Sequence, residues 1–169
     1  MTRIRLTYSS KRGYPIPSDE EIRPLVEISE FLMLHGFTFC RAFAADGISE
    51  ILHTGDAPYY VNYRDLASFR DNFVKDFRIA EEKAINNSGG WISSLNYGHV
   101  DVCLRKGDLL FHAFVGGGVK VEWFNYTREH KALIELVNKE MMRILCTEVV
   151  REEKLDVDKL PRYWNEAIK

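Results

Sequence analysis

Apolar and polar residues alternate with a period of two in several segments, which is the pattern of strands that bury one face. The pattern is clearest in three consecutive segments near the middle of the chain. These predicted strands run from His99 to Arg105, from Leu109 to Val115 and from Val119 to Tyr126. Further strands are predicted at 2–8, 37–45, 48–53 and 91–96. Short turns between neighbouring segments favour an antiparallel sheet.

Apolar residues spaced three or four positions apart predict three longer helices and one short terminal helix. The first is predicted to begin at Ser18, which forms a capping box with Glu21, or at Pro24, and to end before Gly36. The second is predicted to begin at an Asn62 cap and to end at 86–90, and the third extends from Thr127 to about Val149. A charged link at 151–154 then leads to the terminal helix at about 160–168.

Together these elements predict an α+β fold. We expect one domain over residues 1–169, with a largely antiparallel sheet of about six to seven strands that includes a meander at 91–126. The sheet is expected to pack against the three main helices and the short C-terminal helix.

The register of the meander follows from its turns. If Lys106–Gly107 closes the first hairpin, Asp101 lies opposite His112, and a glycine turn at 116–118 places His112 opposite Glu122. All inward positions are then apolar, whereas a slip by one residue would turn polar side chains into the core.

The outer face of this sheet therefore carries a polar row of Ser94, Asp101, His112 and Glu122. A hydrolytic triad requires the histidine between nucleophile and carboxylate, which this order does not provide. Asp101, His112 and Glu122 are suitable metal ligands, although no spacing motif supports them. Cys103 with His99 is a further candidate nucleophile that lacks an orienting group. Cross-strand pairing of charged residues on a half-solvated sheet explains the row without any chemistry.

Aromatic side chains on the same face indicate a second kind of site. Phe114, Phe124 and Tyr126 lie among charged residues, and a loop at 54–60 adds Tyr59 and Tyr60. Apolar anchors among charged neighbours are typical of protein contact surfaces. We therefore expect a partner-binding surface that combines these aromatics with Asp101, His112 and Glu122. The alternative, a helix that covers part of this face, is the more common reason for such aromatics.

Composition narrows the classes of function. The 169 residues are 46% hydrophobic and 12% aromatic, which suits a folded core. The net charge of −2 and the absence of a basic run give no indication of nucleic-acid binding. No segment has the apolar length of a membrane span or a signal peptide, and three widely spaced cysteines suit a reducing cytoplasm.

No motif of a kinase, P-loop, Rossmann site, zinc finger or nucleic-acid module is present, and no cofactor is expected. Binding is therefore favoured over catalysis. The leading hypothesis is a cytosolic protein that binds a protein partner, as inhibitors and bacterial immunity proteins do. The alternatives are a metal-dependent hydrolase or nuclease that uses Asp101, His112 and Glu122, and a domain that binds a small ligand.

Overall fold

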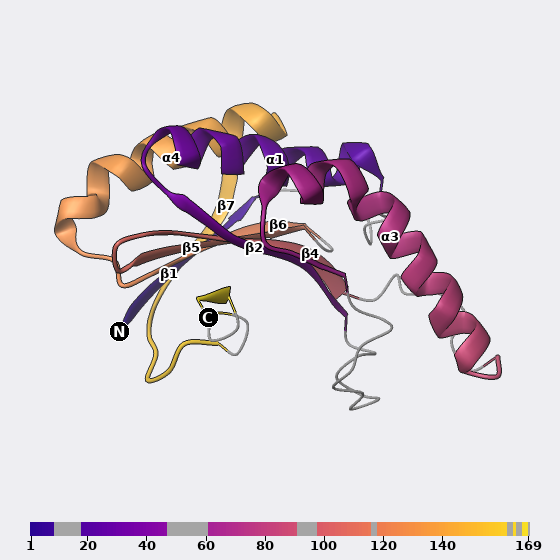
Figure 1. The fold of residues 1–169 in the computed structure, drawn as a ribbon. Coiled ribbons are helices and arrows are strands. Elements are labelled where there is room, and N and C mark those ends of the chain that lie inside the picture. Colours follow the sequence, from indigo (N-terminus) through magenta and orange to yellow (C-terminus); the bar gives the residue numbers. More distant parts are fainter. Residues whose placement is uncertain are drawn as a thin grey trace.

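The computed structural model describes residues 1–8, 18–46, 61–90, 98–115, 118–161, 164 and 167–168. Its centre is an antiparallel seven-stranded sheet in the order β3-β2-β4-β5-β6-β1-β7 (Figure 1). The strands are β1 (Thr2–Tyr8), β2 (Thr38–Asp46), β3 (Asn62–Tyr63), β4 (Gly98–Lys106), β5 (Leu109–Val115), β6 (Val119–Phe124) and β7 (Val149–Asp156). The helices are α1 (Asp19–Leu34), α3 (Leu66–Asn87) and α4 (Lys131–Leu145), the last preceded by a 3-10 turn, η1 (Arg128–His130). The predicted α+β class is confirmed.

The two faces of the sheet are covered differently. Helices α1, α3 and α4 lie over one face, called the inner face here, and the C-terminal residues lie on the opposite, outer face (Figure 1). The main core fills the space between the inner face and the helices. It includes the edge-to-face pair of Phe111 and Trp123, whose ring centroids are 4.8 Å apart. Among the described residues, no helix combines the length and apolar character needed to cross a membrane.

The helix termini follow local chemistry. The Ser18 side chain accepts a hydrogen bond from the Glu21 amide, as the capping box predicts, and the first helix ends before Gly36 as expected. The second helix begins later than predicted: Asn62 belongs to β3, and Asp65 is the cap, with its carboxylate accepting from the Ser68 amide. Either residue type can cap a helix, so composition did not distinguish the two positions.

The predicted register is correct for β5 and β6 and wrong for β4 and β5. His112 lies opposite Glu122, but Asp101 lies opposite Phe114, because the turn is at 107–108 and Lys106 pairs with Leu109. Gly107 adopts a positive φ of 58°, which glycine allows at no steric cost. The difference amounts to two residues, so the described side chains of β4 and β5 stay on their predicted faces.

The predicted charged link at 151–154 is also wrong, because these residues lie within the edge strand β7. Strand β1 lies between β6 and β7 and pairs with both. The predicted strands at 48–53 and 91–96 fall outside the described residues.

The C-terminal segment docks on the outer face. Trp164 is fully buried and packs with Phe43, Cys103, Leu110 and Phe124 in a second, smaller apolar cluster. The guanidinium of Arg64 donates a hydrogen bond to the backbone oxygen of Ala167, at 3.0 Å. The end of the chain therefore covers part of the face on which the polar row lies.

Candidate functional site

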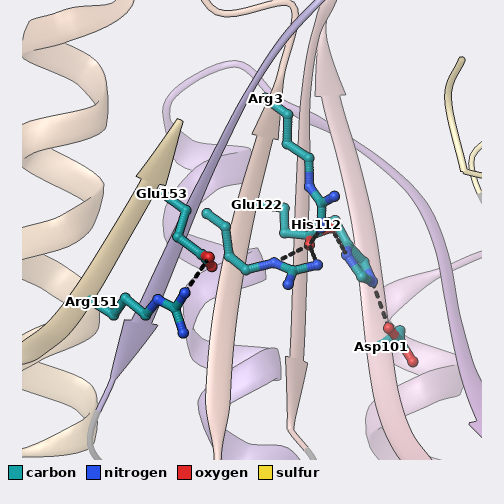
Figure 2. A network of polar contacts seen from close by, with 7 residues as sticks. Arg3, Asp101, His112, Glu122, Arg151 and Glu153 are labelled. Carbon is teal, nitrogen blue, oxygen red and sulfur yellow. Dashed lines mark hydrogen bonds and ion pairs between the residues drawn. The ribbon is translucent and has the colours of Figure 1, made fainter. Parts of the chain in front are cut away.

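A row of charged side chains crosses four neighbouring strands on the outer face. Asp101 comes from β4, His112 from β5, Glu122 from β6, and Arg3 and Arg5 from β1. Figure 2 shows the side chains from Asp101 to Arg3 reaching toward one another across the strands. Although Asp101 is diagonal to His112 rather than opposite it, the two side chains meet, because diagonal neighbours in a sheet are within reach of long side chains.

His112 lies between two carboxylates. Its Nε2 is 2.5 Å from Oδ1 of Asp101, its Nδ1 is 3.2 Å from Oε2 of Glu122, and its side chain is 2% exposed. Burial by itself lowers the pKa of this imidazole, but the hydrogen bonds to both carboxylates and their negative charges outweigh burial, so the pKa is raised. The protonated ring donates from both nitrogens and satisfies both acceptors. The ring also stacks on Phe114, with centroids 5.1 Å apart.

Glu122 connects this histidine to the first strand. Its Oε1 accepts hydrogen bonds from Nη2 of Arg3 and, at 2.7 Å, from Nε of Arg5. Its Oε2 faces His112, so both carboxylate oxygens are occupied. Asp101 and Glu122 are 0% and 1% exposed, and a buried carboxylate is tolerated only with partners of this kind.

This arrangement is poorly suited to hydrolytic or metal chemistry. Both ring nitrogens of His112 face carboxylates, so neither is directed at a nucleophile, and Ser94 lies outside the described residues. The described part of the chain contains no group of three or more His, Cys, Asp or Glu side chains placed to hold a metal ion. Asp101, His112 and Glu122 form a line rather than converging on one point, so the geometry does not support the alternative ligand set.

Cys103 is equally unsuited to act as a nucleophile. It is fully buried beside Trp164. Burial, followed by the nearby charge of Asp101, raises the pKa of its thiol well above the ordinary value. The thiol therefore stays protonated at neutral pH, whereas a cysteine nucleophile acts as the thiolate.

The structure separates the aromatic residues predicted to form one contact surface. Phe124 is covered by Trp164, with ring centroids 6.4 Å apart. Tyr126 packs against the main core on the helix side, because Asn125 adopts a positive φ of 61° and ends the alternation of β6. Phe114 is half-buried on the outer face.

Three of the predicted contact residues, Asp101, His112 and Glu122, are buried in the charged row and do not lie on the surface. Tyr59 and Tyr60 lie outside the described residues. The predicted partner-binding surface is therefore reduced, within the described residues, to the neighbourhood of Phe114.

Two participants in the row were missing from the sequence interpretation. Arg3 and Arg5 alternate with Ile4 and Leu6, which correctly places them on the polar side of the first strand. That pattern does not reveal which strand pairs with β1, because Arg3 and Glu122 are 119 positions apart. The comparisons add no signal: no family model matches the chain, and neither the curated proteins nor the solved structures contain a significant match.

Proposed function

We propose that this protein acts by binding a protein partner and not by catalysis, in the manner of small inhibitors and immunity proteins. One observation carries the proposal: the most suggestive polar cluster of the described fold is buried, and its groups bond one another. His112 uses both ring nitrogens and Glu122 both oxygens within the row. A catalytic group needs an atom that can reach a substrate, and these contacts support a structural role instead.

A contiguous part of the outer face is partly exposed. Phe114 pairs with Lys120 across β5 and β6, and Lys120 pairs with Thr7 across β6 and β1. Arg5 is two residues from Thr7 on the same face. We call Phe114, Lys120, Thr7 and Arg5 the outer-face patch. All four are partly exposed, and the Lys120 ammonium lies 5.7 Å from the centre of the Phe114 ring.

The composition of the outer-face patch suits a protein partner. An aromatic anchor surrounded by cations is the usual anatomy of a contact surface, in which the aromatic supplies most of the energy and the charged rim supplies selectivity. The three free cysteines fit a reducing compartment, so the proposal includes a cytoplasmic location. The alternative that the protein binds a small ligand at another place on the fold stays a prediction.

Site-specific cross-linking tests the proposal. A photoreactive benzoylphenylalanine at position 114 is expected to capture one protein in the cells that produce this chain. The same group at Ile79, which is 42% exposed on α3, is the matched control. Capture of the same protein at both positions, or no capture at position 114, would contradict the placement of the partner on the outer-face patch.

A further inference from the structure

Two arginines share one carboxylate oxygen at the border of the outer-face patch. Nη2 of Arg3 and both Nε and Nη2 of Arg5 approach Oε1 of Glu122, the Arg5 contacts at 2.7 and 2.6 Å. On the other side of the same carboxylate lies His112, whose raised pKa favours its cationic form. Three cationic groups therefore surround a single negative charge.

Asp101 offsets part of this excess, because its Oδ1 lies 2.5 Å from Nε2 of His112 and balances the imidazolium. One positive charge then remains over Arg3, Arg5 and Glu122. Glu153 is directly opposite Arg5 in the pairing of β1 with β7, yet its Oε1 forms an ion pair with Arg151, at 2.8 Å (Figure 2). Within the described part of the chain, Glu122 is the sole anionic partner of both Arg3 and Arg5.

The two guanidiniums also retain donor capacity. Nε of Arg3 is buried and has no acceptor within the described residues. The Arg3 guanidinium lies 5.7 Å from the centre of the Phe124 ring, a contact that limits its movement. The side chains of Arg3 and Arg5 are 15% and 28% exposed, so both are largely shielded from water and reach the surface in part.

We propose that Arg3 and Arg5 form a subsite for a carboxylate, supplied by an aspartate or glutamate side chain of the protein partner. The inference rests on the proposed function and specifies the chemistry that the partner brings. Guanidinium groups bind carboxylates through paired, charge-assisted hydrogen bonds, and partial burial strengthens these bonds. The bound carboxylate balances the excess positive charge, and Phe114, two strands away on the same face, supplies the apolar contact with the partner.

The test uses the full chain and a pentaglutamate peptide as the probe. The arginine Nε–Hε signals are followed by NMR at low ionic strength, with pentaglutamine as the uncharged control peptide. We expect the Arg3 and Arg5 signals to move together with pentaglutamate and not with pentaglutamine. Arg5→Gln is expected to weaken binding by about tenfold, because one of the two cations is lost.

Arg151→Gln is the matched control, because Arg151 is a more exposed arginine on the neighbouring strand and already has a carboxylate partner. Its effect should stay below about twofold, as for a solvent-screened surface charge. Arg5→Lys retains the charge but not the paired donors, and its intermediate affinity would support carboxylate recognition even if Arg5→Gln folds poorly. Equal losses in Arg5→Gln and Arg151→Gln would overturn the subsite.

Two further results separate the subsite from the proposed function. If inorganic phosphate binds as tightly as pentaglutamate, the site accepts any anion and the assignment to an acidic side chain is wrong. If the cross-linked partner binds Arg5→Gln as tightly as the unmodified chain, the subsite is wrong and the binding function stands. If pentaglutamate binds at Arg3 and Arg5 but position 114 captures no protein, the carboxylate subsite stands and the placement of a protein partner on the outer-face patch fails.

Discussion

Replacing Trp164 with alanine should release the C-terminal segment from the outer face. Trp164 is fully buried against Phe124 and the apolar side chains beside it, and it is the largest side chain that the segment contributes to this cluster. A buried tryptophan removes roughly 150–250 Å² from water. At about 25 cal/mol per Å², that area corresponds to about 4–6 kcal/mol. A compact unfolded state reduces the figure to about 3–5 kcal/mol.

Urea denaturation followed by far-UV circular dichroism measures this loss. We expect the free energy of unfolding to fall by about 3 kcal/mol, near the lower limit, because the released segment regains conformational entropy. The slope of the free energy against urea should also decrease, since a native state with an undocked segment exposes less additional surface on unfolding. Ile168→Ala is the matched control: Ile168 belongs to the same segment but is 41% exposed, so its replacement should cost less than about 0.5 kcal/mol.

A loss of less than about 1 kcal/mol in Trp164→Ala, with an unchanged urea slope, would refute this reasoning. It would mean that the segment contributes little to the stability of the sheet. Trp164 would then cover Phe124 for only part of the time. The outer face would then be open to a partner over a much larger area than the outer-face patch.

Three further predictions concern the sheet. Because the folded-state pKa of His112 is raised above its ordinary value of 6.5, its stabilising contribution should be complete below that pH and should decline as pH rises through the folded-state value. His112→Gln should be less stable at pH values below the folded-state pKa of His112 and should lose this dependence, and a parallel decline in both proteins in pH-dependent urea melts would contradict the assignment. Phe111→Ala or Trp123→Ala should cost roughly 3–5 kcal/mol, and a loss below about 1 kcal/mol would exclude their buried contact. In the folded protein, a thiol reagent should modify the exposed Cys146 and not the buried Cys103. Both cysteines should react in urea. Fast modification of Cys103 in the folded protein would show that the segment over it opens readily.

Local signals in the sequence were sufficient for much of the fold. Ser18 and the glycine at 36 mark the limits of the first helix, and side-chain alternation identifies β5 and β6. The error in the β4–β5 register shows a limit of the same signal. A period of two detects a slip by one residue but not a slip by two, so an apolar inner face cannot distinguish a turn at 106–107 from one at 107–108.

Other features depend on contacts between distant parts of the chain. Strand β7 was missed because an edge strand with mostly exposed side chains lacks the apolar alternation of a buried strand. The polar row was identified, but its burial was not, because Arg3 and Trp164 reach the outer face from opposite ends of the chain. These contacts bury Asp101, His112 and Glu122, so the row is not the surface site that the sequence predicts.

The position of β1 has a consequence for the order in which the protein folds. This strand precedes the other described strands in the chain, yet both of its neighbours, β6 and β7, are the last two of them. The amide of Val157 even donates a hydrogen bond to the carbonyl of Met1. During synthesis β1 therefore has to wait for β6 and β7, with Ile4 and Leu6 exposed to water in the meantime. Such distant pairing is typical of slow folding, so the insertion of β1 between these two strands should be a late step.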